Sequence, residues 1–468
     1  MLVMIALGLY ILMENRNPSS TIAYLLTLIF LPVIGVIIYL VFGQNYRKKR
    51  IFSRKLVRDN MLVTQWEQQN LRELKRLGEQ GLFDLHPLLR ISKMMMNTSS
   101  AVLTKQNEVD VLTNGNEAFP AFLEAMKNAR HHIHIDMYIL EEDDIGHTII
   151  QLLINKAREG VEVRLSYDAV GSRLSKRTIR ELTQNRVRVY PFMPVRFPAL
   201  TSKINYRNHR KIIVVDGNIG FVGGMNLADR YTNTGKQEGF WRDTHARIKG
   251  EAVWSLQLQF MLTWRFVSGE ELLGDAVYFP QSEISGNHLV QIVESGPDTP
   301  WSNIMKGIFM AISNARHYVL IQTPYFIPNE EVLRAIEGAA LSGVQVKIMI
   351  PAKGDSRIAQ AATYSYIRPM LEAGAEVFLY QLGMLHAKTL VIDGAMCCIG
   401  TANMDYRSFD LNFEINAFIY DVETSERLAK DFENDLAHCR QLDLTRWNKR
   451  RLRKRFSESL ARIFAPLL

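Results

Sequence analysis

Cysteine is nearly missing from this sequence, with only three in 468 residues. Two of them, Cys397 and Cys398, are adjacent, and Cys439 stands alone. This spacing cannot build the disulfide framework of a small secreted protein, and it lacks the paired ligands of a zinc site. The cysteine usage therefore fits a protein kept in a reducing, cytoplasmic setting.

Acidic residues are too few to balance the basic ones, which leaves a formal net charge of +8 and a pI near 9.2. Such a balance favours an anionic partner, either nucleic acid or an anionic membrane surface, and charge alone does not choose between them. Hydrophobic residues make up 47% of the chain and charged residues 22%, which excludes a disordered protein. At 468 residues the chain is long enough for two or three domains.

Charged residues are absent from residues 21–42, a run long enough to cross a hydrocarbon core of about 30 Å as a helix. Residues 1–13 are also apolar, but at about 1.5 Å per residue they would reach only about 20 Å. This first segment has no basic region and no small-residue cleavage site, so it is not a typical signal peptide. We therefore predict an N-terminal transmembrane helical hairpin, in preference to a buried helix of a soluble protein.

Basic residues indicate which side of the membrane the rest of the chain occupies. The predicted hairpin loop contains only Arg16, whereas a basic collar follows the second apolar run: Arg47, Lys48, Lys49, Arg50, Arg54, Lys55 and Arg58. Because such residues collect on the cytoplasmic side, we predict a multi-pass protein of the cytoplasmic (inner) cell membrane, with the bulk of the chain in the cytoplasm. The collar would also attract anionic lipid.

Beyond a polar connector that follows the basic collar, one sequence pattern occurs twice. Asn-Ala-Arg-His is found at residues 128–131 and again at 314–317, each time before a strand-like run. In both halves amphipathic helical stretches alternate with short β-branched runs, which is typical of an α/β layer structure. The predicted units are the hairpin and basic collar (1–50), a connector (51–108), a first domain (109–285), a second domain (286–445) and a basic amphipathic tail (446–468).

Each half contains the same compact block of chemistry-bearing residues. The pattern His-x-Lys-x4-Asp-x6-Gly-x-x-Asn occurs as His209, Lys211, Asp216 and Asn226, and again as His386, Lys388, Asp393 and Asn403. On a strand, the period of two places each histidine and its lysine on one face. Each aspartate precedes a glycine, a common hairpin-turn pair, so a structural role for the aspartates is an alternative to a catalytic one. Matching motifs in two repeats indicate one shared active site.

These twin motifs resemble those of the phospholipase D superfamily, whose members exchange phosphodiesters. The resemblance covers residues 110–440 and implies two α/β/α sandwich repeats with an active site between them. One departure is Gly224, where many relatives carry serine, whereas Thr401 in the second copy keeps a hydroxyl. The first half-site would therefore lack a hydrogen bond that the second retains.

The residues suit this reaction on chemical grounds. A phosphodiester needs a nucleophile, an acid for the leaving alkoxide, and cations around the phosphoryl oxygens. With a reference pKa of about 6.5, one imidazole can be neutral while the other is protonated. In the family's usual order His209 is the nucleophile that forms a phosphohistidine and His386 is the general acid, and the reverse order stays open. The phosphate would be held by Lys211, Lys388, Asn226 and Asn403.

Relatives commonly orient each histidine with a carboxylate further along the chain. The resemblance assigns this role to Asp243 for His209 and to Glu414 for His386, with an ordinary strand-edge charge as the alternative. We expect neither a metal nor another cofactor, because no carboxylate cluster accompanies the histidines and the neighbouring lysines would repel a cation.

The membrane hairpin narrows the substrate class, and more specifically the chain resembles the bacterial cardiolipin synthases. The matching forms are residues 208–211, 223–226, 241–243 and 464–468. This resemblance implies a phosphatidyltransferase that joins two phosphatidylglycerol molecules into cardiolipin and releases glycerol. Its partners would be phosphatidylglycerol and anionic membrane lipids, with no nucleic acid.

Two other classes of function stay open: a membrane-bound hydrolase or nuclease with the same half-sites, and a scaffold that binds anionic lipid without chemistry. The tail also has two interpretations. Residues 446–468 combine a basic run with apolar residues at helical spacing. Such a helix could lie on an anionic membrane or pack as a solvated helix on the second domain.

Overall fold

The computed structural model describes residues 2–13, 18–33, 35–36, 39, 76, 88–99, 101–195, 205–234, 239–272, 276–281, 284 and 286–467. Near the N-terminus, helices α1 (Leu2–Met13) and α2 (Pro18–Phe30) pack together through Ile11 and Leu28. Within the described ranges, no helix combines the length and the apolar character needed to cross a membrane. The spanning helix at residues 21–42 therefore stays a prediction, and the basic collar lies outside the described residues.

A seven-stranded sheet forms the first repeat, in the order β2-β9-β7-β6-β3-β4-β5. Its strands are β2 (Asn107–Thr113), β3 (His132–Met137), β4 (Glu162–Asp168), β5 (Arg188–Phe192), β6 (Lys211–Val215), β7 (Ile219–Gly223) and β9 (Thr244–Gly250). Its outer face is covered by α7 (Gly115–Lys127), α8 (Asp144–Arg158) and α9 (Lys176–Gln184), and α10 (Ala252–Ser268) packs on the other face.

The second repeat has a sheet of nine strands in the order β1-β10-β19-β17-β16-β11-β13-β14-β20. Its strands are β1 (Leu103–Thr104), β10 (Leu289–Ser295), β11 (Tyr318–Gln322), β13 (Gln345–Pro351), β14 (Glu376–Tyr380), β16 (Thr389–Ile392), β17 (Met396–Gly400), β19 (Glu414–Tyr420) and β20 (Cys439–Gln441). Its helices include α11 (Asn303–Ser313), α12 (Glu330–Leu341), α13 (Arg357–Glu372) and α15 (Val422–Leu436). The seven inner strands follow the same order as the first sheet, which confirms the predicted duplication and the α/β fold.

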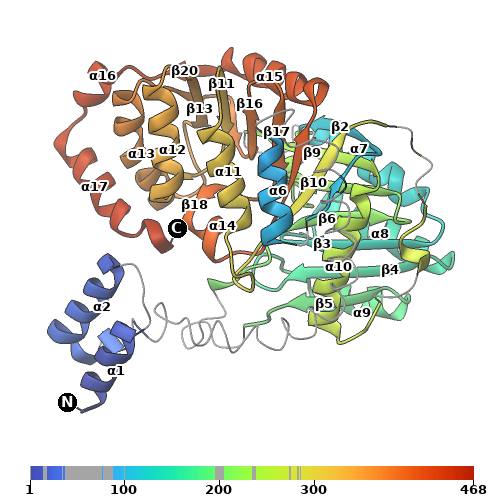
Figure 1. The fold of residues 1–468 in the computed structure, drawn as a ribbon. Helices are drawn as coiled ribbons and strands as arrows, with labels where there is room; N and C mark the ends of the chain where they lie inside the picture. Colours follow the sequence, from blue (N-terminus) through green and yellow to red (C-terminus); the bar gives the residue numbers. More distant parts are fainter. Residues whose placement is uncertain are drawn as a thin grey trace.

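The two sheets pack face to face (Figure 1). Strand β6 shows how the sequence dictates this arrangement, because its side chains alternate between two apolar layers. Ile213 and Val215 contact the outer helices, whereas Ile212 and Val214 join a cluster that includes Val391 of β16. A strand that is buried on both faces reads as a continuous β-branched run, as β6 does. The ends of the central strands β6 and β16, which carry the motifs, are thereby held close to each other.

Segments outside the two predicted domains pack on the second repeat. Helix α6 (Leu89–Thr98) of the connector buries Ile91 and Met95 in the core beside α11, and β1 extends the second sheet. In the tail, α16 (Leu444–Asn448) and α17 (Leu452–Ile463) lie against α13 (Figure 1). The connector and the tail therefore contribute to the second core.

Candidate active site

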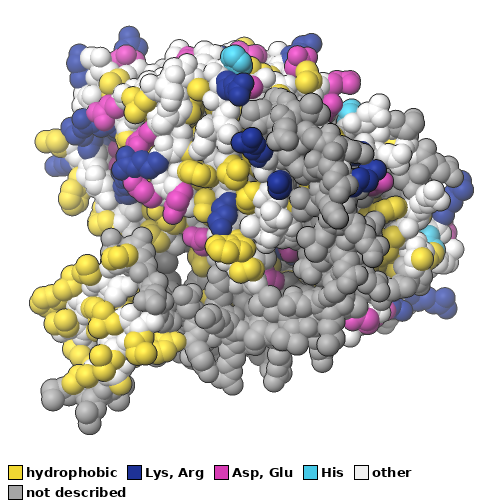
Figure 2. All heavy atoms as spheres, in the orientation of Figure 1, with side chains coloured by type: hydrophobic (Ala, Val, Ile, Leu, Met, Phe, Trp, Pro, Cys, Tyr) yellow, Lys and Arg dark blue, Asp and Glu magenta, His cyan; other side chains and the backbone are white. Residues whose placement is uncertain are grey.

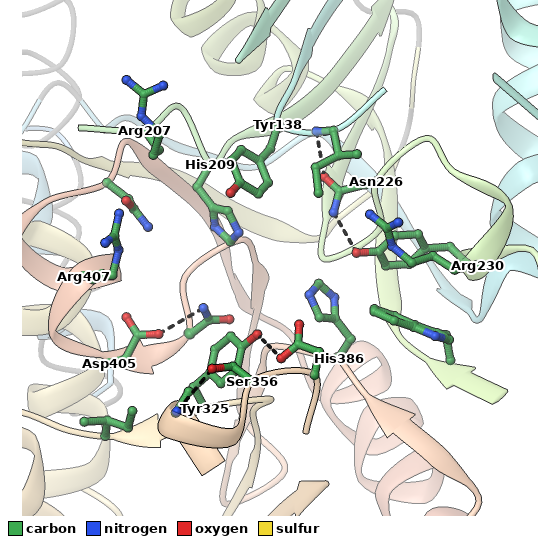
Figure 3. Close-up of a pocket in the computed structure, with 18 residues that line it drawn as sticks. Tyr138, Arg207, His209, Asn226, Arg230, Tyr325, Ser356, His386, Asp405 and Arg407 are labelled. Atoms are coloured by element: carbon green, nitrogen blue, oxygen red, sulfur yellow. Dashed lines mark hydrogen bonds between the residues drawn. The ribbon is translucent and has the colours of Figure 1, made fainter. Parts of the chain in front are cut away.

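A pocket of about 560 Å³ lies between the repeats and contains residues of both motifs (Figure 3). His209 and Asn226 enter it from the first repeat, and His386 and Asn403 from the second. The pocket has the size of a small-molecule site. The structure therefore brings together four of the residues that the sequence selected.

His209 is positioned by contacts with the other repeat. The residue before it, Asn208, forms a bridge with Phe413, and the His209 amide donates to the Phe413 carbonyl at 2.9 Å. This pairing places His209 Nδ1 2.9 Å from Oε2 of Glu414, which is fully buried. The carboxylate of one repeat thus orients the histidine of the other.

His386 is held in the equivalent way, by contacts with the first repeat. Strand β15 (Gly383–Leu385) pairs in parallel with β8 (Phe240–Arg242) of the first repeat, and the His386 amide donates to the Arg242 carbonyl at 2.7 Å. His386 Nδ1 then lies 2.7 Å from Oδ2 of Asp243.

The predicted pairing of each histidine with the carboxylate of its own half is therefore wrong. Asp243 orients His386, and Glu414 orients His209. The reason is that each histidine strand pairs with the segment that precedes the carboxylate in the opposite repeat. Each half-site is thus built from both repeats.

The two lysines lie behind the histidines. Lys211 Nζ donates to the His209 carbonyl at 2.7 Å, and Lys388 Nζ donates to the His386 carbonyl and lies 2.9 Å from His386 Nδ1. Both side chains are buried, and this desolvation lowers the pKa of Lys211 to about 7 and that of Lys388 to about 8. The lysines share a face with the histidines, as the strand period predicts.

The two asparagines line the pocket beside their histidines. Asn226 donates from Nδ2 to the Tyr231 hydroxyl at 2.7 Å, and its Oδ1 accepts from the Ile139 amide. Asn403 donates to Asp405 Oδ2 at 3.1 Å, while its buried Oδ1 has no hydrogen-bond partner among the residues that the structure describes. Amides at the wall of an anion site can exchange such contacts for phosphoryl oxygens.

The sequence assigned Asp216 and Asp393 to the catalytic set with a structural role as the alternative, and their contacts in the structure fit the structural role. Each follows the last residue of a motif strand, in a turn with a φ of 53°. Asp216 accepts hydrogen bonds from the amides of Arg130, His131 and His132, and Asp393 does the same for residues 316–318. The carboxylates thus fix the start of β3 and β11, at the end of each motif strand that is remote from its histidine.

The two half-sites differ where the sequence departs from the family. Thr401 donates to Glu414 Oε2 at 2.6 Å, whereas a Cβ at Gly224 would lie 2.1 Å from Asp243 Oδ1. A serine at Gly224 would therefore displace Asp243 from its present position. Burial raises the pKa of Asp243 to about 6; for Glu414 burial also acts upward, but His209, Lys211 and Thr401 outweigh it and lower the pKa.

Burial also shifts the pKa values of the two histidines. It lowers the pKa of His209, against the attraction of Glu414, and lowers the pKa of His386 well below its usual range with the help of both lysines. The imidazoles are therefore neutral at neutral pH until an anion enters. A neutral imidazole is the form that attacks phosphorus, and an arriving phosphodiester would favour protonation of the second.

The pH dependence of activity should follow from these shifts. The pKa values of the lysines are lowered, so their charge is lost as the pH rises through about 7 to 8, and kcat/KM should fall over that range. Below about 6 the protonation of Asp243 should cause a second fall. Bound phosphate stabilises the ammonium groups, so the alkaline limb of kcat should lie at higher pH. A kcat/KM that stays flat from acid to alkaline pH would contradict this.

Several pocket residues were not selected from the sequence. They include Tyr138, Arg207, Arg230, Tyr325, Asp355 and Arg407. For Arg230 and Arg407 a signal existed, since each stands four residues after the asparagine of its motif. In the described part of the chain no three His, Cys, Asp or Glu residues are grouped as a metal site would require.

Known proteins are similar to this chain in sequence and in fold. The family model for the phospholipase D-like domain of cardiolipin synthase matches residues 122–252 and 308–436, and a phospholipase D-nuclease N-terminal model matches residues 2–44. The chain is 44% identical to cardiolipin synthase 2 of Bacillus anthracis, over 99% of this chain and 89% of that protein. It is 43% identical to the cardiolipin synthase of Alkalihalophilus pseudofirmus, over 99% and 92%.

A solved structure supports the fold independently. The phosphatidylserine synthase of Haemophilus influenzae superposes with a TM-score of 0.60 at 16% identity, covering 81% of this chain and 97% of that one. The twin motifs, the shared pocket and the full-length similarity agree, and the chain belongs to the cardiolipin synthase family of proteins with phospholipase D-like domains.

Proposed function

We propose that this protein is a cardiolipin synthase that transfers a phosphatidyl group between two phosphatidylglycerol molecules and releases glycerol, reversibly and through a phosphohistidine. The observation that carries the proposal is the pair of histidines, each bound to a buried carboxylate, on opposite walls of one pocket. A covalent intermediate suits transfer, because glycerol can leave before the second lipid arrives.

In the first step His209 Nε2 attacks the donor phosphorus. Its Nδ1–H donates a hydrogen bond to Glu414, which leaves the Nε2 lone pair free to face the pocket. The nitrogen–phosphorus bond forms, the bond to the glycerol oxygen breaks, and His386 gives that oxygen a proton. Lys211, Lys388, Asn226 and Asn403 offset the charge on the phosphoryl oxygens.

In the second step the roles reverse. His386, now neutral, takes the proton of the acceptor hydroxyl, whose oxygen forms the new bond to phosphorus. The phosphorus–nitrogen bond breaks and its electron pair returns to His209. Water in place of the lipid hydroxyl would make the enzyme a hydrolase, so the exclusion of water decides the product.

We also propose that the protein is embedded in the cytoplasmic membrane through its N-terminal helices, with the catalytic repeats on the cytoplasmic side. The apolar side chains that α1 and α2 leave exposed support this, among them Leu9, Met13, Ile29 and Phe30, and they gather on one part of the surface (Figure 2). The orientation rests on the sequence of the basic collar.

Helix α17 has the form of a second membrane contact. One face is buried against the second repeat through Glu458 and Ala461, and an apolar stripe faces outward: Leu452, Phe456, Leu460, Ile463 and Phe464. Arg451, Arg453 and Lys454 are exposed near its start. An apolar stripe flanked by basic residues is typical of a helix that lies in an anionic interface.

A fluorophore attached at Phe456→Cys should therefore be quenched by lipids that carry a quencher in their tails, in the full chain reconstituted in phosphatidylglycerol vesicles. Leu341→Cys is the matched control, since Leu341 is 73% exposed and Phe456 71%. Leu341 lies before the start of β13, whereas the pocket lies beyond its end. Equal quenching at both positions would contradict a contact specific to α17.

The function is tested by lipid mass spectrometry of the purified protein in phosphatidylglycerol vesicles with a chelator present. We expect cardiolipin and glycerol in equal amounts from the wild type, and neither from His209→Ala. Phosphatidic acid as the main product would make the protein a hydrolase. An absence of lipid turnover, with cleavage of nucleic acid instead, would favour the nuclease.

A further inference from the structure

The pocket is lined by guanidinium groups, in addition to the motif lysines that lie behind the histidines. Arg230 and Arg407 both line it, and they occupy equivalent places in the repeats, four residues after Asn226 and Asn403. One transferred phosphate is already provided with two lysines and two asparagines. Glu141 and the pocket residues Asp355 and Asp405 offset part of this added charge, so the geometry around each arginine decides whether it can bind a second anion.

Arg230 stands on the His386 side of the pocket (Figure 3). Its guanidinium lies over the rings of Tyr231 and Trp241, at 5.5 and 5.6 Å from their centres. The same two rings lie 5.4 and 5.5 Å from the His386 ring. Arg230 is therefore separated from the general acid by one layer of aromatic side chains that line the same pocket.

The guanidinium is fixed without being enclosed. Nη1 donates to Glu141 at 2.7 Å, and the Arg230 side chain is 29% exposed. A guanidinium has five N–H donors in one plane, so one carboxylate contact leaves others for a ligand. Arginine held in this way is suited to bind a phosphodiester through two parallel hydrogen bonds.

The chemistry of transfer places a second phosphate on this side. The leaving glycerol departs beside the general acid, and the acceptor hydroxyl must enter where that glycerol left. The acceptor phosphatidylglycerol carries its own phosphodiester one glycerol unit beyond the attacking oxygen. That phosphate is not consumed, and it needs a site separate from the phosphorus under attack.

We propose that Arg230, oriented by Glu141 and stacked on Tyr231 and Trp241, binds the intact phosphodiester of the acceptor phospholipid. The inference rests on the proposed function and names the acceptor subsite of that reaction. It makes the enzyme prefer an alcohol that bears a phosphodiester over glycerol or water. In the step it serves, His386 Nε2 takes the acceptor proton, the oxygen–phosphorus bond forms, and the bond from phosphorus to His209 breaks.

The experiment compares two acceptors for the same phosphatidyl-enzyme, with the full chain in phosphatidylglycerol vesicles. Cardiolipin formation uses an acceptor that bears a phosphodiester, and the exchange of isotope-labelled glycerol into phosphatidylglycerol uses one that does not. Arg230→Gln should lower the ratio of cardiolipin to exchange by about ten-fold or more, because a charge-assisted contact is lost only for the first acceptor. Arg230→Lys keeps the charge and should retain part of the ratio, and it serves as the test if the glutamine variant does not fold.

The matched control is Arg407→Gln, the equivalent residue on the His209 side, whose ratio should stay near that of the wild type even where both rates fall. Equal loss of both reactions in Arg230→Gln, measured per folded enzyme, would overturn the subsite while leaving the proposed function intact. A ratio that falls in Arg407→Gln instead would also overturn the assignment to Arg230. A wild type that forms no cardiolipin would overturn the proposed function and, with it, the subsite.

Discussion

Replacing His386 with alanine should trap the phosphatidyl group on His209. With phosphatidyl-p-nitrophenol as the donor, the leaving group needs no proton, so the first step should still proceed in His386→Ala. The acceptor hydroxyl then lacks its base, and turnover should fall by about 100- to 10,000-fold. We expect a burst of nitrophenolate that approaches one per chain, followed by slow release. The lipid should be found on the His209 peptide after rapid quenching and proteolysis.

His209→Ala is the matched variant, because it removes the other imidazole of the same pocket. It should give no burst even with the activated donor, since no nucleophile is left to accept the phosphatidyl group. The opposite result, a burst in His209→Ala and none in His386→Ala, would reverse the order of the two histidines. Steady turnover without a burst in both variants would exclude a phosphohistidine altogether.

The architecture could be predicted from the sequence because its signals are local. Strands are visible as short β-branched runs such as residues 211–215, and the duplication repeats these runs in the same order. The face shared by His209 and Lys211 also follows from the period of two. A local pattern does not show which segment of the opposite repeat pairs with the residues beside each histidine. That pairing decides which carboxylate each histidine contacts.

The role of the motif aspartates shows a second limit. The pattern that joins Asp216 to His209 along the chain suggests shared chemistry, and yet the strand β6 that separates them carries the aspartate to its far end. The Asp-Gly pair was the better guide, since the turn it forms directs the carboxylate onto the amides of residues 130–132. The regular spacing of motif residues is therefore evidence for a common fold, and it does not by itself place all of these residues in one site.

The tail packs on the second repeat, which is one of the two interpretations that its sequence allowed, and the membrane contact stays a prediction. Residues such as Trp447 and Ala461 are buried in the second core, while Phe456 and Ile463 on the same segment are each 71% exposed. An amphipathic pattern identifies an apolar face, and here Glu458 and the small residue Ala461 supply the contact with the protein while the large apolar side chains face outward. The exposed face is the one that the quenching experiment tests.

Each histidine is oriented by a carboxylate of the opposite repeat, and replacing these carboxylates should have the second large effect on activity. Glu414→Gln should damage the function of His209, and Asp243→Asn that of His386, although each carboxylate lies downstream of the other histidine in the sequence. An amide in place of a buried carboxylate removes the charge that orients the imidazole and stabilises its charged form. In a hydrolytic triad such a replacement costs about 10,000-fold in kcat. We expect losses of about 100- to 10,000-fold in cardiolipin formation from both variants.

The activated donor separates the two expected defects. Glu414→Gln should slow the burst itself, as His209→Ala abolishes it, whereas Asp243→Asn should keep a fast burst and lose turnover, as His386→Ala does. Thermal unfolding of both variants serves as the control for folding, since both carboxylates are buried at the interface of the repeats. If Asp243→Asn slowed the burst while Glu414→Gln spared it, each carboxylate would act on the histidine of its own half, and the crossed contacts would not be those of the working enzyme. If the crossed pattern is found, neither repeat can hold a competent histidine alone, because the carboxylate that each one needs is supplied by the opposite sheet.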